Sequence, residues 1–523
     1  MEIVNNRAVL VNTKQPNKIT EVIPKATVVK QVALPNGQLG STVAVPWSLR
    51  NTKLLHNLGF KKVPSPITGK YEFPGLFKPF AHQVETAGFL TLNQKAFCLN
   101  DMGTGKTASV AWAADYLLSL GIIKRVLVVC PLSIMDCAWR ADLFKTLMHR
   151  RVDIAHGSAA KRRAVIASDA EFVAINYDGL EVVHKELMNG GFDLIICDEA
   201  SALCEVRTKR WKLMNQLVRP ETWLWLLTGT PAAQSPDKAY GIAKLVNPAS
   251  VPSFHGAFKD KVMTKVSQFR YLPRADAQAT LHKILQPAIR FTKEECLDLP
   301  EMTYVDREVP LTAQQQKYYD KLKQQMLVHA AGEEISAVNA AVEMGRLLQI
   351  SSGSVYSDSG AVVEFDCSNR LNELLCIIEQ SDHKTLIFAN YTHSIDLIQR
   401  HLTKHGISND TINGSVSLGK RSELIEKFQK TSEPQVLVIQ PQAAAHGITL
   451  HAANTVIWFG PIMSLEYYLQ ANARVHRAGQ KNPCTVVHLF GSTVEKQMYK
   501  RLQGKKEDQE GLLAMYKNVI GIA

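Results

Sequence analysis

Two series of short apolar runs, each followed by an amphipathic stretch, dominate the chain between residues 95 and 490. The first series is KAFCLN, RVLVVCP, EFVAIN, FDLIIC and WLWLLTG, and the second is KTLIFAN, NDTING, PQVLVIQ, NTVIWFG and CTVVHLF. Continuous apolar runs of this length are typical of parallel strands that are covered on both faces. The pattern therefore predicts two α/β lobes, each built on a parallel sheet.

The segments outside these series have a different pattern. Residues 1–75 contain many prolines and two short β-type runs, ATVVKQVAL and STVAV. Residues 255–350 contain mostly helical patterns, such as TAQQQKYYDKLKQQMLVHAA. A chain of 523 residues is too long for a single core. We expect an accessory domain over 1–75, a first lobe with the start of a helical insertion over 76–298, and a second lobe over 299–523.

Composition narrows the class of protein. Hydrophobic residues make up 46% and charged residues 21%, as in ordinary folded proteins. No apolar run reaches the roughly 18–20 residues that a membrane span requires, and MEIVNNRAVLV does not resemble a secretion signal. The nine cysteines form no CxxC pair, which predicts reduced core thiols and no metal cluster. We expect a cytoplasmic monomer.

Positive charge is concentrated near the two ends of the chain. The formal net charge is +12, and residues 1–80 contain 11 Lys and Arg but only 3 Asp and Glu. Residues 470–506 contain 8 basic residues and one acidic residue. This imbalance favours a polyanionic partner, although a solvated basic surface without a partner has the same composition.

One glycine-rich loop follows the first apolar run directly, in LNDMGTGKTASVAWAADYLL. Gly103 and Gly105 allow a tight turn that aims backbone N–H groups inward, as a phosphate cradle requires. Lys106 is suited to reach the β- and γ-phosphates, and Thr107 to offer a hydroxyl to Mg²⁺. Asn100 occupies the first glycine position of the GxxxxGK[ST] pattern, so a flexible strand-to-helix turn stays open as an alternative.

A pair of acids ends another buried run, FDLIICDEAS. The carboxyl ends of strands face the ligand crevice of an open parallel sheet. Asp198 is suited to hold Mg²⁺, and Glu199 to orient and deprotonate an attacking water. A lone acidic pair is also common as a solvated turn. Because this pair follows Lys106 by 92 residues, on what we expect to be a neighbouring strand, ATP and Mg²⁺ are the predicted cofactors.

Five motifs occur in the order found in helicase superfamily two: MGTGKT, VLVVCPLSIMDCAW, DEAS, LLTGTP and QANARVHRAGQ. The last motif, preceded by LHKILQPAIRFTKEECLDLPEM, resembles the SWI/SNF-type translocase branch. Within that branch, the chain is similar to bacteriophage-encoded members and to annealing helicases. The resemblance covers about Phe77 to Leu502. It implies an α/β fold of two tandem RecA-like lobes, the P-loop NTPase helicase core.

The resemblance also implies roles for residues of the first lobe. The nucleotide-binding residues of the loop are Met102, Gly103, Thr104, Gly105, Lys106 and Thr107. KPFAHQ is similar to the adenine-reading motif, which places Gln83 at the base edge, although any helix start can carry such a residue. Thr228 and Thr230 resemble the motif that couples the nucleotide site to lobe movement. Ser201 stands where the family usually has histidine, which puts the polar bridge from that position in doubt.

The second lobe carries the motif QANARVHRAGQ. Arg474 and Arg477 are three residues apart and would share one face of a helix. In the family these positions supply arginine fingers to the nucleotide, whereas the alternative is a solvated basic face. Gln470 is implied to contact the γ-phosphate or the attacking water. Gly447 corresponds to an interlobe loop that senses nucleotide and DNA.

DNA contacts in the family come from loops that follow lobe strands. Such contacts hold the sugar–phosphate backbone and position the protein without reading sequence. By motif position the candidates are Pro131, Ser133, Asn390, Thr392, Asn413 and Gly414. Each of these residue types alone is common in ordinary loops. We expect Trp139 to lie in the core or to support its loop, and not to stack on bases.

The function that this resemblance implies is a DNA-dependent ATPase. It would translocate on duplex or branched DNA and remodel or reanneal it in replication, recombination or repair. A helicase that separates strands of branched DNA or RNA is one alternative, although no separation pin is recognisable. An ATP-gated clamp with little turnover is another, and the intact Lys106, Asp198, Glu199 and arginine pair argue against it.

Overall fold

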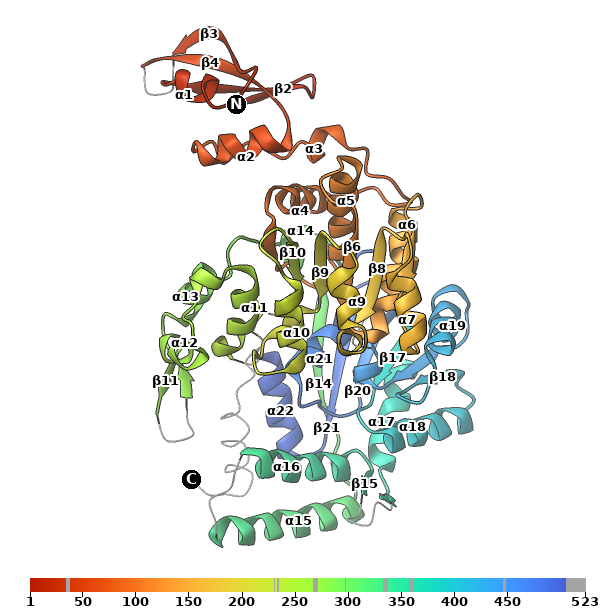
Figure 1. Ribbon diagram of the computed structural model, residues 1–523. Helices are drawn as coiled ribbons and strands as arrows, with labels where there is room; N and C mark the ends of the chain where they lie inside the picture. Colours follow the sequence, from red (N-terminus) through yellow and green to blue (C-terminus); the bar gives the residue numbers. More distant parts are fainter. Residues whose placement is uncertain are drawn as a thin grey trace. The chain divides into compact units, whose positions relative to one another are not determined.

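The computed structural model describes residues 1–33, 38–229, 231–232, 235–266, 271–296, 298–332, 337–356, 362–444 and 448–504 (Figure 1). The chain divides into two compact units. The first contains Met1–Gly229, Tyr240–Val251 and His282–Cys296, and the second contains Thr230–Ala239, Pro252–Leu281 and Leu297–Ala523. Each unit is built around a parallel sheet, which confirms the expectation of two α/β lobes.

The large sheet of the first unit has seven strands, and every neighbouring pair is parallel. Its spatial order is β13 (Ala288–Ile289), β5 (Lys95–Cys98), β10 (Trp223–Leu227), β9 (Leu194–Asp198), β6 (Val126–Cys130), β8 (Phe172–Asn176) and β7 (Val152–Ile154). The strand β10 lies between β5 and β9. The expectation that the acidic pair ends a strand next to the phosphate loop's strand is therefore wrong, because periodicity along the chain does not encode spatial strand order.

The central strands of this sheet are buried on both faces. All five residues of β6, β8, β9 and β10 are buried, which is why these segments read as unbroken apolar runs. The covering helices of the unit are α4 (Ala81–Leu92), α5 (Lys106–Ser119), α6 (Leu143–Thr146), α7 (Ala159–Ile166), α8 (Gly179–Val182), α9 (His184–Asn189), α10 (Lys209–Leu217), α11 (Ala239–Val246) and α14 (Lys293–Cys296). A π-helix, η2, spans Met135–Asp142.

Four strands between Glu2 and Pro46 form an antiparallel sheet. Its order is β1 (Glu2–Val4), β2 (Ala8–Thr13), β4 (Leu39–Pro46) and β3 (Thr27–Ala33), with α1 (Asn17–Thr20) beside it. Its apolar residues form their own cluster with Trp47, Leu55 and Val63. Leu55 of this cluster lies on α2 (Leu49–Asn57), whereas Leu49 of the same helix and Ile67 of α3 (Ile67–Lys70) belong to the core of the first lobe. The N-terminal region thus has a small core of its own and also packs against the core of the first lobe.

The sheet of the second unit has six strands, and all its pairs are parallel. The order is β14 (Met302–Glu308), β21 (Cys484–Phe490), β20 (Ala453–Trp458), β17 (Lys384–Phe388), β19 (Val436–Ile439) and β18 (Asn409–Ile412). Successive side chains of a strand face opposite sides. Accordingly Leu437 and Ile439 belong to one apolar cluster, whereas Val438 belongs to another. Both faces are therefore buried.

The helical expectation for residues 255–350 is confirmed in the main by α12 (His255–Val262), α13 (Ala277–Ile284), α15 (Ala313–Gly332) and α16 (Ala337–Ser351). The same stretch also contains β14 and a hairpin of β11 (Met263–Lys265) and β12 (Tyr271–Pro273), which the pattern did not indicate. The other helices of the unit are α17 (Ser368–Glu379), α18 (Thr392–Lys404), α19 (Leu418–Lys430), α20 (Pro441–Ala444), α21 (Leu465–Asn472) and α22 (Thr493–Gln503), and β15 (Ser354–Tyr356) pairs with β16 (Val362–Glu364). Within the described ranges, no helix combines the length and apolarity needed to cross a bilayer.

Candidate nucleotide site and DNA-contact loops

The phosphate loop connects the end of β5 to the first residue of α5. Gly103 and Gly105 have φ values of 85° and 78°, a left-handed conformation that favours glycine. The ammonium of Lys106 donates to the carbonyl oxygens of Asn100 and Asp101, at 2.9 and 3.1 Å. The first N–H groups of α5 have no partner within a helix and form an anion-binding end. The geometry is that of a phosphate cradle whose lysine closes on the loop itself.

Two residues of α4 hold the loop from one side. His82 Nε2 and Gln83 Nε2 lie 2.8 and 3.2 Å from the carbonyl oxygen of Thr104. The side-chain oxygen of Gln83 accepts a hydrogen bond from the backbone N–H of Phe80 at 3.0 Å. Gln83 thus connects the phosphate loop to the start of α4. Its contact with an adenine base stays a prediction, for which the amide still has a second N–H.

Asn100 explains the departure from the usual glycine pattern. Its side chain is buried, donates to Thr86 Oγ1 at 2.9 Å and accepts from the backbone N–H of Phe291 at 3.0 Å. Glycine at this position could make neither bond. The loop is therefore fixed to α4 and to residue 291 by a side chain that the sequence pattern marks only as a deviation.

The acidic pair lies at the carboxyl end of β9. Asp198 is 8% exposed, and its Oδ1 accepts from the backbone N–H of Glu199 at 3.0 Å. Glu199 has φ 50° and ψ 57°, which is a left-handed conformation for a residue with a side chain. Such strain costs about 1–3 kcal/mol and is concentrated at functional sites. The strained backbone directs the glutamate away from the regular path of the strand.

Two aromatic residues hold Asp198 in place, and the motif search assigned neither a role in the site. The indole N–H of Trp139 donates to Oδ2 of Asp198 at 2.9 Å, and the hydroxyl of Tyr177 donates to its backbone oxygen at 2.8 Å. Burial, followed by nearby negative charge, raises the pKa of Tyr177, so its hydroxyl stays a donor at neutral pH. Trp139 is fully buried, as expected for a core or loop-supporting residue.

The predicted coupling motif begins next to the phosphate loop. The backbone N–H of Thr228, which follows β10, donates to the oxygen of Cys98 at 3.1 Å. A Cβ atom on Gly229 would meet Met102 and the oxygen of Asn100 at about 3.6 Å. Gly229 therefore lies within van der Waals distance of the phosphate loop. Thr230 lies outside the described residues.

The arginine pair of the second unit lies in turns beyond the end of α21, which stops at Asn472. The expectation that both arginines share a helix face is therefore wrong. They nevertheless converge, because Arg474 Nη1 and Arg477 Nη1 donate to the carbonyl oxygen of Ile448 at 3.5 and 2.9 Å. Turn geometry brings them together here. Gly447, which precedes that carbonyl residue, lies outside the described residues.

Gln470, on the helix that precedes this arginine pair, has one buried polar atom without a hydrogen-bond partner among the described residues. It is fully buried on α21, and its Nε2 donates to Glu466 Oε1 at 3.3 Å. Its Oε1 has no hydrogen-bond partner among the described residues. A buried acceptor without a partner is costly, and such groups often serve a ligand. This observation supports the role in nucleotide contact that the motif implies.

The predicted DNA-contact residues of the first unit, Pro131 and Ser133, follow β6 directly. Pro131 is partly exposed, and Leu132 beside it is 41% exposed. The placement of the Ser133 side chain lies outside what the structure describes. The backbone runs from here through a short 3₁₀ turn into η2.

The predicted contact loops of the second unit are connected by Gln440, which the motif search missed. Gln440 donates to the oxygen of Asn390 at 3.3 Å and accepts from the N–H of Gly414 at 3.1 Å. Asn390 Nδ2 donates to the oxygen of Pro461 at 2.6 Å, and its Oδ1 has no partner among the described residues. Thr392 begins α18 and is exposed. The structure thus joins the loops after β17 and β18 at the carboxyl edge of one sheet.

The loop that carries Asn413 is also supported by a cation. Arg421 donates to the oxygen of Asn413 at 3.0 Å and to that of Val416 at 2.9 Å. The side-chain oxygen of Asn413 accepts from the N–H of Ser415 at 3.0 Å. Backbone groups of this loop are therefore held in a fixed arrangement.

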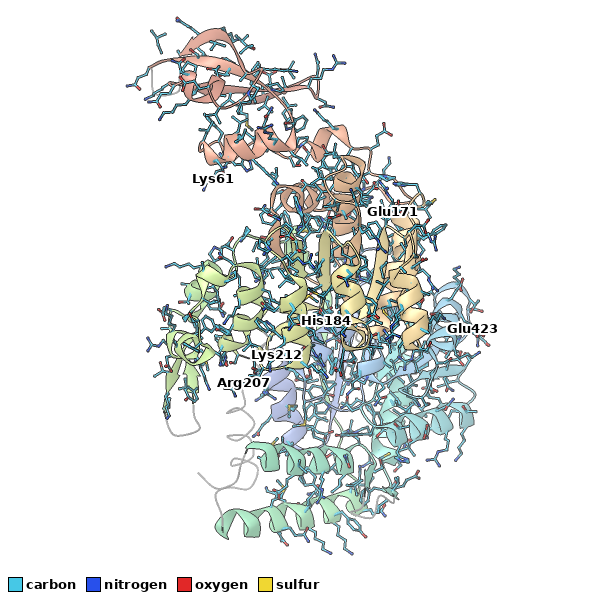
Figure 2. The ribbon with its side chains drawn as sticks, viewed as in Figure 1. Lys61, Glu171, His184, Arg207, Lys212 and Glu423 are labelled. Atoms are coloured by element: carbon cyan, nitrogen blue, oxygen red, sulfur yellow. The ribbon has the colours of Figure 1, made fainter. Side chains whose placement is uncertain are left out.

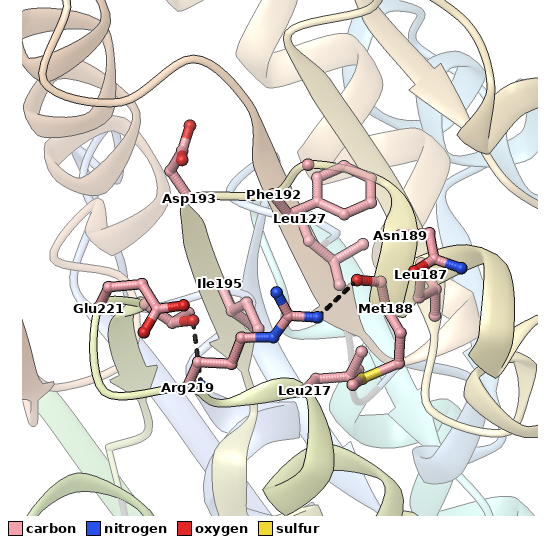
Figure 3. A pocket seen from close by; sticks show the side chains of 12 residues that line it. Leu127, Leu187, Met188, Asn189, Phe192, Asp193, Ile195, Leu217, Arg219 and Glu221 are labelled. Atoms are coloured by element: carbon pink, nitrogen blue, oxygen red, sulfur yellow. Dashed lines mark hydrogen bonds between the residues drawn. The ribbon is translucent and has the colours of Figure 1, made fainter.

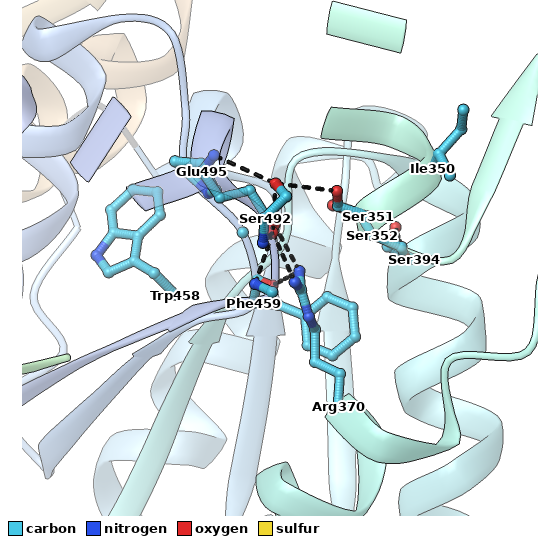
Figure 4. Close-up of polar contacts among 12 residues, drawn as sticks. Ile350, Ser351, Ser352, Arg370, Ser394, Trp458, Phe459, Ser492 and Glu495 are labelled. Carbon is cyan, nitrogen blue, oxygen red and sulfur yellow. Dashed lines mark hydrogen bonds and ion pairs between the residues drawn. The ribbon is translucent and has the colours of Figure 1, made fainter. Parts of the chain in front are cut away.

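The second unit also contains a buried ion pair. Arg370 and Glu495 are 2% and 0% exposed and form two hydrogen bonds of 2.8 Å (Figure 4). Arg370 also donates to the oxygen of Phe459, and Glu495 accepts from the N–H groups of Gly491 and Ser492. Because its charges are fully satisfied, we assign this pair a structural role.

A cavity of about 330 Å³ lies in the first unit, at the edge of the large sheet where the strands begin (Figure 3). This edge is opposite to the one from which the phosphate loop leaves. Its lining includes Leu127 and Ile195, near the starts of β6 and β9, together with Arg219. The guanidinium of Arg219 donates to the oxygen of Met188 at 3.0 Å, so it is engaged within the lining. The phosphate loop follows the other end of the strands. This cavity is therefore not the nucleotide site.

The donor set fits ATP with Mg²⁺. The loop offers backbone N–H groups and one ammonium to phosphates, whereas the hydroxyl of Thr107 and the carboxylate of Asp198 are hard oxygen ligands of the type Mg²⁺ prefers. Among the described residues, no group of three or more His, Cys, Asp and Glu side chains could form a separate metal cluster. The residues present thus suit the cofactors that the sequence predicted.

Comparison with known proteins agrees with the motifs. The SNF2-related domain family matches residues 82–352, more than half of the chain, and the helicase conserved C-terminal domain matches residues 368–479. The chain is 26% identical over 454 residues to chromodomain-helicase-DNA-binding protein 1-like of Danio rerio, covering 81% of this chain and 43% of that protein. It is 24% identical over 442 residues to the p41 protein of Acyrthosiphon pisum secondary endosymbiont phage 1, a match that covers 80% of this chain and 94% of that protein.

Solved structures give a weaker match. The Sulfolobus solfataricus SWI2/SNF2 ATPase core in complex with dsDNA is 21% identical, with a TM-score of 0.42, covering 86% of this chain and 94% of that one. The chain spans less than half the length of the first curated relatives, 43% and 39% for the first two.

Proposed function

Because this chain belongs to the SNF2-related domain family, we propose that it is an ATPase stimulated by DNA, which translocates on duplex or branched DNA and remodels or reanneals it. The observation that carries the proposal is the arrangement at the carboxyl edge of the first sheet. There the Lys106 loop and the acids Asp198 and Glu199 follow strands of one sheet, and loop 131–134 begins at the same edge. This arrangement supports a nucleotide site and a nucleic-acid contact loop at the same edge of one sheet.

In the proposed reaction, Lys106 leaves the carbonyls of its own loop and binds the β- and γ-phosphates. Glu199, held in its left-handed conformation, orients water and accepts its proton. Mg²⁺, when bound, neutralises phosphate charge, and Thr107 and Asp198 would hold it. Arg474 and Arg477 stabilise the charge of the transition state, and Gln470 contacts the γ-phosphate or the water. Residues 102–105 and Gly447 complete the nucleotide contacts.

We propose that DNA is held by its backbone through the loops at 131–133, 390–392 and 413–414. Short polar side chains and backbone N–H groups there can contact phosphates without reading bases. The exposed lysines of the N-terminal region add a second, electrostatic surface, and Lys61 extends from it into solvent (Figure 2). This arrangement supports sequence-independent binding to duplex or branched DNA. We further propose that the protein acts as a monomer, since one chain supplies the loop, the acids and the arginines, and that it acts in the cytoplasm.

Two assays test the proposal together. The first measures ATP hydrolysis with single-stranded, duplex and forked DNA and with RNA, and we expect stimulation by duplex or forked DNA. The second compares displacement of a triplex-forming strand with unwinding of a tailed duplex at equal enzyme and ATP. Unstacking costs about 1.4 kcal/mol per base-pair step, and the sequence contains no recognisable wedge, so triplex displacement should dominate. Efficient unwinding alone would favour a strand-separating helicase, and DNA binding without turnover would favour a clamp.

A further inference from the structure

Trp139 connects a loop proposed to contact DNA with a carboxylate proposed to act on ATP. It lies on η2, follows Pro131 by eight residues and is fully buried. Its indole N–H donates to Oδ2 of Asp198 at 2.9 Å. Both partners are in the first unit. The hydrogen bond is therefore a direct physical link between the segment that follows β6 and the end of β9.

The sheet places the two ends of this link side by side. Strands β6 and β9 are hydrogen-bonded neighbours, with Val129 opposite Cys197. The loop with Pro131 and the acid Asp198 thus leave the sheet at adjacent positions. After the loop, the chain turns back so that the indole reaches the carboxylate. The path from the loop to Asp198 therefore consists of the first turn of η2, the side chain of Trp139 and one hydrogen bond.

The helix that carries Trp139 is of a type concentrated at functional sites. The segment Met135–Asp142 is a π-helix, a conformation found mostly as single turns and frequently beside sites of function. One side of η2 faces solvent, where Arg140 and Asp136 form an exposed ion pair of 3.0 Å. The other side carries Trp139 into the core cluster of the lobe. The segment therefore extends from the surface to the carboxylate.

We propose that Trp139 is a positioning residue which, through its indole N–H, couples DNA contact at loop 131–134 to the orientation of the Asp198 carboxylate, so that DNA and nucleotide bind cooperatively. The proposal rests on the proposed function of this site. A hydrogen bond to one oxygen restricts rotation of the carboxylate and directs its remaining lone pairs. Coupling between two ligands is reciprocal and can be measured by binding alone.

The test measures the affinity of a fluorescent non-hydrolysable ATP analogue with Mg²⁺, with and without saturating duplex DNA. We expect DNA to tighten binding by about fivefold or more in the unaltered protein, the lower end of typical coupling between sites. Trp139→Phe keeps an aromatic ring but removes the N–H, and the ratio should fall to about one. A second readout is the Mg²⁺ concentration that gives half-maximal analogue binding, which should rise.

Trp225→Phe is the matched control. Trp225 is also fully buried in the first lobe, and its indole donates to the oxygen of Asn93 at 3.1 Å, a carbonyl outside the site. This variant should keep the full DNA effect. If Trp139→Phe lowers the melting temperature more than the control does, 3-benzothienylalanine at position 139 replaces it, because that residue keeps the bicyclic ring and lacks only the N–H.

The outcomes distinguish a failure of this inference from a failure of the proposed function. An unchanged DNA effect in the isosteric variant overturns the role of Trp139 while DNA-stimulated ATPase activity continues to support the function. A DNA effect of one in the unaltered protein, with stimulated ATPase intact, also overturns it, because no coupling then exists to transmit. Absence of any DNA-stimulated ATPase activity would remove the proposed function itself.

Discussion

Replacing Gly105 with alanine tests the geometry of the phosphate loop at a single atom. Gly105 has φ 78°, and a Cβ atom there would lie 2.0 Å from Nε2 of Gln83. An alanine in the left-handed region costs about 1–2 kcal/mol. Displacing Gln83 also breaks its hydrogen bond to Thr104, a further cost of about 1 kcal/mol. The expected total is about 2–3 kcal/mol.

This cost should be observed mainly in ATP binding. The glycines of the loop are partly exposed, so the free protein can relax, and bound nucleotide must then restore the strained form. A loss of about 2 kcal/mol corresponds to roughly a 30-fold weaker affinity for a fluorescent ATP analogue. In a Gln83→Ala background, Gly105→Ala should cost only the backbone term. A double-mutant cycle should therefore give a coupling energy of about 1 kcal/mol.

Gly121→Ala provides the control for backbone strain without a collision. Gly121 has φ 67°, and a Cβ atom there would meet no atom within 4 Å. Its substitution should lower the melting temperature but leave ATP affinity unchanged, with no dependence on Gln83. Equal losses from Gly105→Ala in both backgrounds would show that Gln83 does not occupy the space beside the loop.

Three further predictions concern the proposed reaction. Lys106→Ala should abolish ATP turnover, and Glu199→Gln should bind ATP but not hydrolyse it, since an amide cannot accept the proton of water; near-normal turnover in either variant would refute the assignment. Arg477→Ala should lower the DNA-stimulated rate by about 10³-fold with nucleotide affinity within a few-fold, whereas Arg400→Ala, an exposed arginine paired with Glu364, should change nothing. Glutamine at the exposed residues Lys14, Lys18, Lys25 and Lys30 should reduce the slope of log affinity against log salt by up to about 0.9 per contacted phosphate, and an unchanged slope would leave the N-terminal region a structural role.

Truncating residues 1–75 would test the same surface less cleanly. Phe73 packs edge-on against Trp112 at 5.5 Å between ring centroids, and the hydroxyl of Tyr71 donates to Asp115. The indole of Trp112 donates to the oxygen of Pro74 at 3.0 Å. Removing these partners would disturb α5, which begins at Lys106. Substitution of the exposed residues Lys14, Lys18, Lys25 and Lys30 leaves this packing intact.

The strand patterns predicted the central strands of both sheets and the edge strand β18, but missed the edge strands β7, β13 and β14. Strands such as β9 are covered on both faces, so each of their positions is apolar and the run is visible in the sequence. By contrast β14 is an edge strand with mostly exposed residues, MTYVDRE, and has no such run. The strand β14 was therefore not predicted, because it lies within residues 255–350, where the other patterns indicate helix. A strand that is buried on both faces is therefore the easiest to recognise from the sequence.

The residues of the candidate site were likewise predictable only in part. Residues whose type is required by the chemistry, such as Lys106 and Asp198, were predicted from their motifs. The hydrogen bonds that hold Asp198 and the contact loops were not predicted, because Trp139 was expected only to lie in the core or support its loop, and nothing in the sequence around Tyr177 and Gln440 indicates their partners. Their roles depend on contacts across 21 to 59 positions of sequence. No local pattern encodes such contacts.

The loop's deviation from the glycine pattern and the behaviour of its lysine have one explanation. Lys106 has hydrogen bonds to two backbone carbonyls and no carboxylate partner among the described residues. Lys106 can therefore exchange neutral carbonyls for phosphates without leaving a carboxylate charge uncompensated. One of these carbonyls belongs to Asn100, whose side chain fixes it to Thr86 and Phe291. The side chain of Asn100 therefore fixes the backbone carbonyl to which Lys106 donates. A glycine at this position has no side chain with which to fix it.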